Sequence, residues 1–251
     1  MSTEPPRFTL YCSPDSANYV VRAYLDMQRL GYSDRPVDRS RNQQRSAAYL
    51  ALNPQGLLPV LTDGDAVLFE TGAILLHLSE AADDPAYTEP SRRAELLKWL
   101  FWVSNTFHAD LRLAFYTHRY TGDVDAQAVV REGVRARVSE HLGLLEGALE
   151  QRQTLGLTGD TASAADVYAL ICLRWALLYP GGAPALASDA EDRRPHWTAR
   201  WPRLAALAAT IERDPGFRRA TAAEAIPVGA PLTAPQRPDV DPDLVTATSN
   251  A

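Results

Sequence analysis

The stretch NPQGLLPVLTDGDAVLFETGA, residues 53–73, contains two short β-prone runs, a tight turn and the start of a helix. The runs Leu58–Thr62 and Ala66–Phe69 are joined by Asp63-Gly64-Asp65, a sequence typical of a β-hairpin turn. A helix over Thr71–Ala81 is predicted to follow directly. A hairpin that leads into a helix is a building unit of an α+β fold, and the rest of the chain is interpreted outward from it.

The segment before this hairpin adds a β-α-β pattern. Phe8–Cys12 is a β-prone run, and residues 17–30 carry apolar side chains at helical spacing. Arg35–Asp38 is predicted to form a second strand and Ser46–Leu52 a short helix. The order β-α-β followed by α-β-β-α predicts a small mixed domain over residues 7–82.

The sequence changes character after residues 83–90, which we predict to be a linker. Residues 91–223 are helical in pattern and contain no credible strand, so they predict an all-helical domain. Its expected elements are helices over Ser91–Tyr120, Asp125–Gln153, Ser163–Tyr179 and Pro202–Arg213, and a loop over Gly181–Pro195. Five prolines among residues 224–251 predict an extended or disordered tail.

The composition leaves little room for lysine or cysteine chemistry. Lys98 is the only lysine and no phosphate-binding loop surrounds it, while Cys12 and Cys172 form no C-x-x-C motif. A zinc ribbon, a disulfide scaffold and a dithiol redox motif are therefore excluded, and we expect no metal site. The 251 residues suit one or two domains.

Charge and hydropathy bear on partners and location. The formal net charge of −6 gives no support to nucleic-acid binding. The first residues are polar, and no apolar run reaches the roughly 18 residues that a membrane span needs. We therefore expect no membrane partner and a cytoplasmic protein.

Four segments together resemble the soluble glutathione transferases, and most closely the bacterial beta class. They are Leu10–Pro14, Asn53–Leu61, Phe69–Ile74 and Ser163–Tyr168, the last extended by Leu173–Ala176. The resemblance covers roughly residues 7–220 and implies a thioredoxin-like N-terminal domain followed by an all-α helical C-terminal domain. It also implies a bacterial detoxification enzyme, glutathione as co-substrate and a homodimer.

The resemblance assigns glutathione-binding roles to residues of the quoted stretch. In thioredoxin-like folds the proline at position 59 is cis, which presents the backbone of Leu58 to the cysteinyl backbone of glutathione. Thr71, at a helix N-terminus, would hold the γ-glutamyl carboxylate, and Glu70 would face the γ-glutamyl ammonium. An ordinary trans proline before Val60 and a plain helix cap at residues 70–71 are the alternatives.

The glycyl carboxylate of glutathione would be bound by an arginine. Three arginines lie in the segment where the family binds this group: Arg39, Arg41 and Arg45. The sequence does not distinguish among the three, and we assign the glycyl carboxylate to Arg45.

Activation of the glutathione thiol is where the chain departs from the beta class. A thiol with a pKa of ~8.5 is only a few per cent ionised at pH 7, and most classes lower that pKa with a hydroxyl near the first helix. Ala17 stands at the position of the beta-class cysteine, so a mixed disulfide cannot form there. Ser16, placed like the serine of the plant phi class, is our first candidate for the thiolate donor, although a helix N-cap is its alternative role. Asn18 is second, because some bacterial relatives use an asparagine amide, and Ser13 is third. Cys12 is expected to face away from the site or into the core.

The predicted helical domain contributes one candidate catalytic residue. The beta class has a His-Lys pair on its first long helix, and His108-Ala109 retains only the histidine. His108 would hydrogen-bond the thiol or the electrophile, or else be a packed side chain. Aromatic residues that would line an apolar acceptor pocket, or pack in the core, are Tyr11, Phe115, Tyr116 and Trp175. Ser163-x-x-Asp166 is interpreted as a structural capping box.

The resemblance implies that a glutathione thiolate attacks a small hydrophobic electrophile without a covalent enzyme intermediate. Two alternatives stay open. One is a glutathione-dependent disulfide or peroxide reductase, and the other is a non-catalytic binding protein, which the alanines at positions 17 and 109 motivate.

Overall fold

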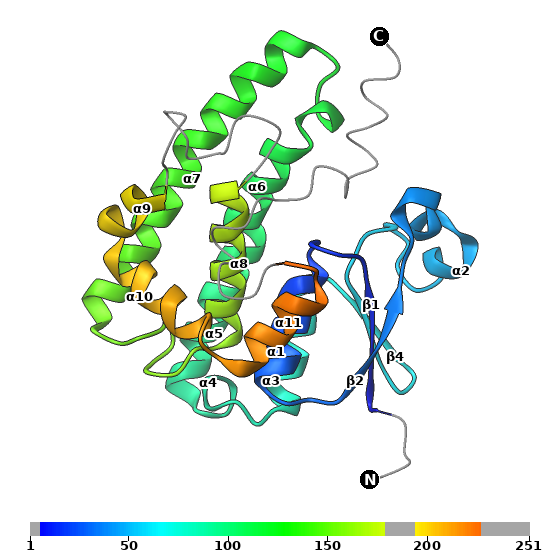
Figure 1. Cartoon of the computed structure of the whole chain (residues 1–251), viewed down its shortest axis with the longest axis horizontal. Coiled ribbons are helices and arrows are strands. Elements are labelled where there is room, and N and C mark those ends of the chain that lie inside the picture. The colour runs from blue at the N-terminus through cyan, green and yellow to red at the C-terminus, as the bar shows by residue number, and fades with distance from the viewer. Residues whose placement is uncertain (1–5, 179–193, 227–251) are drawn as a thin grey trace. The chain divides into compact units, whose positions relative to one another are not determined.

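The computed structural model describes residues 6–178 and 194–226, and the chain divides into two compact units (Figure 1). The described part of unit 1 consists of residues 6–78 and 215–226, and that of unit 2 consists of residues 79–178 and 194–214. Unit 1 is therefore built from both ends of the described chain. The predicted boundary at residue 223 does not coincide with this division, since residues 215–223 belong to unit 1.

Unit 1 contains a four-stranded sheet in the order β2-β1-β3-β4. Its strands are β1 (Phe8–Cys12), β2 (Tyr32–Pro36), β3 (Val60–Asp63) and β4 (Ala66–Phe69). Strands β1 and β2 are parallel, whereas β1–β3 and β3–β4 are antiparallel. This is the thioredoxin-like α+β arrangement expected from the sequence.

The second strand lies earlier in the sequence than predicted. We expected Arg35–Asp38, but β2 ends at Pro36, and Asp38 already caps the following 3-10 turn by accepting a hydrogen bond from the backbone N–H of Arg41. An aspartate that hydrogen-bonds the backbone a few residues onward favours a turn over a strand. The strand prediction missed this local competition.

Short helical elements and two longer helices complete the N-terminal part of unit 1. They are α1 (Asn18–Met27), η1 (Arg39–Arg41), η2 (Gln43–Arg45), α2 (Ala47–Leu50) and α3 (Thr71–Ala81), which crosses the boundary of unit 1 at Leu78. The helix predicted over Thr71–Ala81 is confirmed. Ser46 caps α2 by accepting a hydrogen bond from the backbone N–H of Tyr49.

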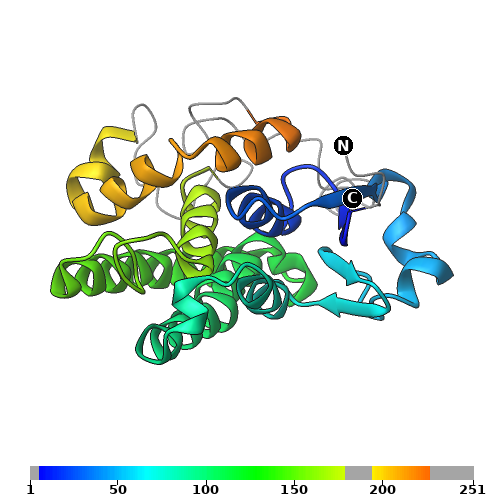
Figure 2. The same ribbon diagram turned by 90° about the horizontal axis from the view of Figure 1, so that it is seen from below.

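The last helix, α11 (Pro215–Ala223), lies beside α1 within unit 1 (Figures 1 and 2). Gly216 permits this approach, because a Cβ there would lie 2.4 Å from the backbone oxygen of Asp26. Phe217 packs against Tyr19 with 5.8 Å between ring centroids, and the Tyr19 hydroxyl lies 2.8 Å from the Thr221 hydroxyl. Periodicity predicted helix here but not the partner against which it packs.

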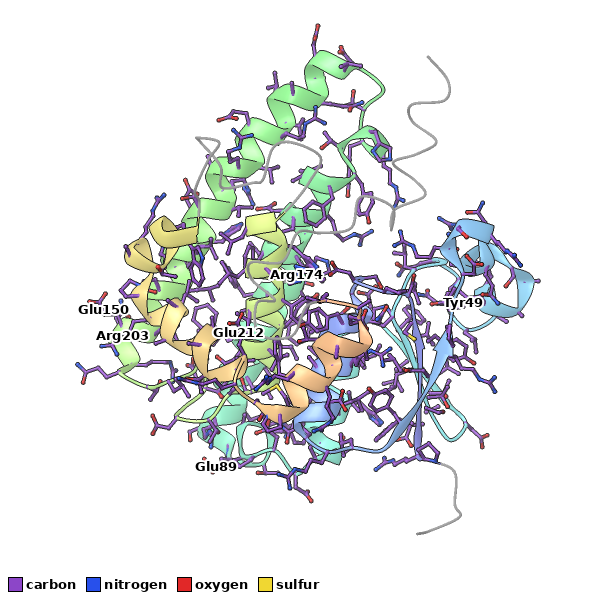
Figure 3. All side chains as sticks on the ribbon, viewed as in Figure 1. Tyr49, Glu89, Glu150, Arg174, Arg203 and Glu212 are labelled. Carbon is purple, nitrogen blue, oxygen red and sulfur yellow. The ribbon has the colours of Figure 1, made fainter. Side chains whose placement is uncertain are left out.

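Unit 2 is helical, as predicted. Its elements are α4 (Pro85–Thr88), α5 (Pro90–Trp102), η3 (Val103–Phe107), α6 (His108–Phe115), η4 (Thr117–Arg119), α7 (Val124–Arg152), α8 (Ala164–Leu178), α9 (Arg194–Arg200) and α10 (Pro202–Ile211). Figure 3 labels Arg174, whose side chain lies on the buried helix α8. The predicted loop over Gly181–Pro195 lies outside the described residues up to position 193, and its last two residues are helical instead, since they begin α9. The predicted tail lies outside the described residues from position 227. No helix in the described ranges combines the length and apolarity that crossing a bilayer requires.

The helix predicted over Ser91–Tyr120 is present but not regular, and it ends earlier, at Phe115. Helix α5 passes into a π-helical turn, η3, before α6 begins at His108, and a 3-10 turn follows Phe115. Residues 104–106 are Ser-Asn-Thr, which are weak helix formers that compete for backbone hydrogen bonds. The wider turn buries Val103 and Phe107 together.

The Asp166 half of the predicted capping box is present at the start of α8 and is wholly buried. The carboxylate of Asp166 accepts hydrogen bonds from the backbone N–H of Ser163 at 2.8 Å and from the Ser163 hydroxyl at 2.6 Å. Its other oxygen accepts a hydrogen bond from the backbone N–H of Leu157 at 2.7 Å. Asp166 therefore ties the loop before α8 to the first turn of the helix, as a structural residue would.

Candidate functional site

Strand register brings the predicted site segments of unit 1 to one end of the sheet. Tyr11 of β1 is aligned with Val60 of β3, and Val60 is aligned with Phe69 of β4. The residues after Cys12, those before Val60 and those after Phe69 therefore leave the sheet at the same end. These three segments carry the predicted site residues: Ser13, Ser16 and Asn18 after β1, Leu58 and Pro59 before β3, and Glu70 and Thr71 after β4.

The loop before β3 is held by side chains beneath it. Asn53 Nδ2 and the hydroxyl of Tyr49, labelled in Figure 3, both donate to the backbone oxygen of Leu57, each at 2.9 Å. The Leu58–Pro59 peptide bond is cis, as predicted. Among the described residues no hydrogen bond involves the backbone of Leu58, so its N–H and C=O are open to an extended ligand.

Glu70 and Thr71 form the junction between β4 and α3. Glu70 has φ of 72°, in the left-handed region that non-glycine residues rarely adopt and that is concentrated at functional sites. Its side chain is exposed and accepts a hydrogen bond from Gln55 Nε2 at 3.1 Å. Thr71 is the first residue of α3, where backbone N–H groups lack partners within the helix and the dipole favours an anion.

Arg45 is the predicted arginine that reaches this loop. Its Nη1 atom donates to the backbone oxygen of Gln55 at 3.0 Å. Gly56 makes room for it, because φ there is 64° and a Cβ would lie 2.8 Å from Nη1 of Arg45. Arg41 instead lies 3.5 Å from Asp38. This favours Arg45 over Arg41 as the cation beside the Leu58 loop.

The three candidate thiol-activating residues share one hydrogen-bond centre, the side-chain oxygen of Asn18. It accepts a hydrogen bond from the backbone N–H of Ser13 at 2.9 Å and another from the hydroxyl of Ser16. Ala17, not Ser16, is the N-cap of α1, and no side chain caps that helix. Asn18 is fully buried, whereas Ser16 is only partly buried. The alternative role of Ser16 as an N-cap is therefore wrong.

The cysteine next to this group is a structural residue. Cys12 is the last residue of β1 and is 6% exposed, as expected for a side chain that faces the core. Burial raises the pKa of its thiol to about 11, so thiolate is scarce at neutral pH.

In the described ranges no group of three or more His, Cys, Asp or Glu side chains is placed to hold a metal ion.

Two charged residues that the sequence did not single out complete the centre. The carboxylate of Glu224 accepts hydrogen bonds from Asn18 Nδ2 at 2.8 Å and Arg22 Nε at 2.6 Å. Its second oxygen accepts a hydrogen bond from the backbone N–H of Asp15 at 2.7 Å. Glu224 was predicted to open an extended tail, but it is 2% exposed. No local pattern marks it, because its partners lie more than 200 positions away.

Burial and charge oppose each other at this ion pair. Burial raises the pKa of Glu224 to about 7, while the neighbouring Arg22 guanidinium acts to lower it. Burial acts to lower the pKa of Arg22. The hydrogen bonds and charges of Asp34 and Glu224 outweigh burial and raise this pKa. Arg22 also donates to Asp34 at 2.8 Å. Arg22 thus stays a cation between two carboxyl groups.

His108, the predicted catalytic residue of unit 2, is packed among aromatic side chains. Its Nδ1 atom lies 2.6 Å from the hydroxyl of Tyr168, and its ring centroid is 5.1 Å from that of Trp175. Burial and the charge of Arg112 lower the pKa of His108 to about 3. The imidazole is therefore neutral at physiological pH. Trp175 is buried beside it, which matches core packing.

This lowered pKa predicts a pH dependence of stability. The unfolded chain binds a proton at His108 below pH 6.5 but the folded chain does not, so stability falls as pH decreases from 6.5 toward 3. His108→Asn is expected to reduce the loss of stability between pH 7 and pH 5 by about 2 kcal/mol. Urea unfolding at the two pH values measures this, with Tyr168→Phe as a control that keeps the histidine. An unchanged pH difference in His108→Asn would contradict the assignment.

Comparison with known proteins agrees with this geometry. The family model described as "Glutathione S-transferase, N-terminal domain" matches residues 6–80. Glutathione S-transferase 3 of Zea mays is 31% identical over 227 residues, which cover 87% of this chain and 95% of the maize protein. The chain belongs to the glutathione S-transferase family. Disulfide-bond oxidoreductase YfcG of Escherichia coli strain K12 is 28% identical to this chain over 173 residues. The match covers 66% of this chain and 77% of YfcG.

A solved structure extends the agreement to the whole fold. A glutathione transferase from Burkholderia graminis, solved with two glutathione molecules bound per subunit, superposes with a TM-score of 0.73. It is 21% identical and covers 87% of this chain and 89% of its own. This likeness shows the glutathione transferase fold, a thioredoxin-like domain and a helical domain. The particular relation to the beta class stays a prediction.

Proposed function

We propose that this chain is a glutathione transferase that binds glutathione on unit 1 and activates its thiol for attack on a small hydrophobic electrophile. The observation that carries the proposal is the convergence, at one sheet end, of the open Leu58 backbone, the N-terminus of α3 and the Ser16 hydroxyl. An extended backbone, an anionic terminus and a thiol are the three features of a peptide such as glutathione that these groups match.

Each part of the tripeptide has a complementary group. The backbone of Leu58 pairs with the cysteinyl residue, as an added strand would. Thr71 and the first N–H groups of α3 receive the γ-glutamyl carboxylate, and the exposed carboxylate of Glu70 receives the ammonium. Arg45 binds the glycyl carboxylate. This assignment uses the charges of both ends of glutathione and leaves its thiol near the loop of Ser16.

Ser16 is the proposed hydrogen-bond donor to the thiolate, and Asn18 is the residue that holds the loop on which Ser16 lies. Asn18 Oδ1 already receives the backbone N–H of Ser13, so the Ser16 hydroxyl can turn toward sulfur without leaving that oxygen unpaired. Hydrogen bonding to a thiolate lowers the thiol pKa, and a lowering of about two units makes thiolate the major form at pH 7. Catalysis then rests on thiolate stabilisation and proximity.

Other features follow from this proposal. Unit 2 supplies the acceptor pocket, and the neutral His108 is available only as a hydrogen-bonding group. The enzyme acts as a homodimer in cytoplasmic detoxification. Residues 7–82 and 91–223 are the predicted domains, with α11 as the exception that packs in unit 1.

A glutathione-dependent disulfide reductase is the second candidate. One observation favours it, the relative named disulfide-bond oxidoreductase. The resemblance adds an expectation in the same direction, since it aligns Ala17 with the beta-class cysteine. A reductase of this kind would also use a stabilised glutathione thiolate. It differs from the transferase in the electrophile, which is sulfur instead of carbon.

The decisive experiment measures glutathione binding and thiol ionisation together. Calorimetry should detect glutathione binding, and ultraviolet absorbance of the bound thiolate against pH should give a pKa below that of free glutathione. Faster conjugation of chlorodinitrobenzene than reduction of hydroxyethyl disulfide supports the transferase, and the reverse supports the reductase. No binding of glutathione would exclude both enzymes and leave a non-catalytic protein.

A further inference from the structure

The carboxylate of Glu224 uses three hydrogen-bond donors to join the end of α11 to the start of α1. The donors are Asn18 Nδ2, Arg22 Nε and the backbone N–H of Asp15. Glu224, Asn18 and Arg22 are each 4% exposed or less. Because hydrogen bonds to buried charged groups are strong and costly to leave unmade, this contact fixes the local geometry.

The carboxylate determines which way the Asn18 amide faces. The Glu224 oxygen that accepts the Arg22 Nε–H faces a cation and acts only as an acceptor, so the group of Asn18 pointed at it is the NH₂. The amide oxygen consequently faces the backbone N–H of Ser13 and the hydroxyl of Ser16. A reversed amide would set NH₂ against the Ser13 N–H and an oxygen against Glu224.

The same carboxylate also fixes the backbone on which Ser16 sits. Glu224 Oε2 accepts the N–H of Asp15, the residue directly before Ser16. The loop that carries Ser16 is thus held at two backbone points, the N–H of Asp15 on Glu224 and the N–H of Ser13 on the Asn18 oxygen that Glu224 orients, which leaves the Ser16 hydroxyl free to turn toward sulfur. Both restraints originate at a residue directly after α11, more than 200 positions further along the chain.

We propose that Glu224 is a positioning residue for thiol activation: through the Asn18 amide and the Asp15 N–H it holds the backbone of residues 13–16 so that the Ser16 hydroxyl can turn to the glutathione sulfur. The inference rests on the proposed function. Glu224 does not touch the substrate and acts only through Asn18 and the loop of residues 13–17.

The neighbouring charges make this role distinguishable from a purely electrostatic one. The groups that interact with Glu224 are Arg22, Asp15, Asn18 and the Cys12 thiol, and Arg22 is shared with Asp34 and Tyr32. Removing the negative charge of Glu224 leaves Arg22 less compensated, which favours a nearby thiolate and lowers the thiol pKa. Loss of positioning weakens the Ser16 hydrogen bond and raises that pKa. The two roles predict shifts of opposite sign.

The test is Glu224→Gln in the full chain with bound glutathione. Glutamine has one acceptor oxygen, so at least one of the three donors loses its partner. We expect the thiol pKa of bound glutathione to rise by about one unit, and conjugation of chlorodinitrobenzene at pH 6.5 to fall about fivefold and recover at high pH. Thr221→Val is the matched control. It removes the hydroxyl near Tyr19 on the same buried face of α11, yet leaves the Glu224 contacts intact.

The outcomes separate this inference from the proposed function. A raised thiol pKa in Glu224→Gln, with Thr221→Val like wild type, supports positioning. An unchanged or lowered pKa in Glu224→Gln, or an equal rise in Thr221→Val, overturns it while the transferase stands. Wild type that binds no glutathione overturns both. If Glu224→Gln does not fold, Glu224→Asp keeps the charge but withdraws it by one methylene, and the same pKa rise is expected.

Discussion

Ser16→Ala is expected to raise the pKa of the bound glutathione thiol by about two units and to lower kcat/KM for conjugation at pH 7 roughly 25-fold, as the thiolate fraction falls. The variant removes the only proton that the Ser16 side chain can offer to sulfur. The backbone of residues 13–18 should keep its geometry, because Asn18 Oδ1 retains the Ser13 N–H and Asn18 Nδ2 retains Glu224. Glutathione binding should therefore change little, since the Leu58, Thr71 and Arg45 contacts are untouched.

The measurement is thiolate absorbance against pH, paired with conjugation rates. Ser33→Ala is a suitable control. It removes a hydroxyl that lies 3.2 Å from that of Thr9, on the edge strand β2 of the same unit. If Ser16→Ala leaves the thiol pKa unchanged, Ser16 is not the donor, and Ser13→Ala becomes the next variant to test.

Asp166→Ala is expected to lower the free energy of unfolding by about 3–5 kcal/mol. The substitution strands two backbone N–H groups, those of Leu157 and Ser163, in a fully buried position. Burial raises the pKa of Asp166, although the hydrogen bonds from Leu157 and Ser163 act to lower it. Urea denaturation of the full chain measures the loss.

Asp123→Ala is the matched control for that prediction. Asp123 caps α7 in the same way, accepting hydrogen bonds from the N–H groups of Asp125 and Ala126, but it is exposed. Water replaces an exposed cap, so the expected cost is about 1 kcal/mol. Similar losses in the two variants would mean that burial adds nothing to the Asp166 cap.

Local patterns were sufficient for the elements that local chemistry determines. Thr71–Ala81 was predicted correctly because an acid and a threonine precede an apolar helical repeat, and the Asp63-Gly64-Asp65 turn placed the hairpin. The site residues at positions 58, 59, 70 and 71 were found through motif resemblance, and strand register explains why they meet. Register itself depends on pairing between strands that are distant in sequence.

The part that sequence reasoning missed is the part held by distant contacts. Arg22 looks like an ordinary charged position within α1, and Glu224 like the start of a proline-rich tail. Their 2.6 Å ion pair joins positions 202 residues apart, and no periodicity reports such a separation. The π-helical turn at Val103–Phe107 was missed for another reason, since apolar residues there still fit helical spacing.

The placement of α11 in unit 1 has a consequence for biosynthesis. The strands of unit 1 leave the ribosome first, but helix α11 of that unit follows residues 79–214, the described part of unit 2. At typical translation rates of 5–20 residues per second, the wait from Leu78 to Ile226 is on the order of 10–30 s. During that time Tyr19 lacks Thr221 and Arg22 lacks Glu224, the partners that they contact in the finished protein. The loop of Ser16 therefore acquires its final geometry last, and a chain cut short before Pro215 would contain every predicted glutathione-binding residue without it.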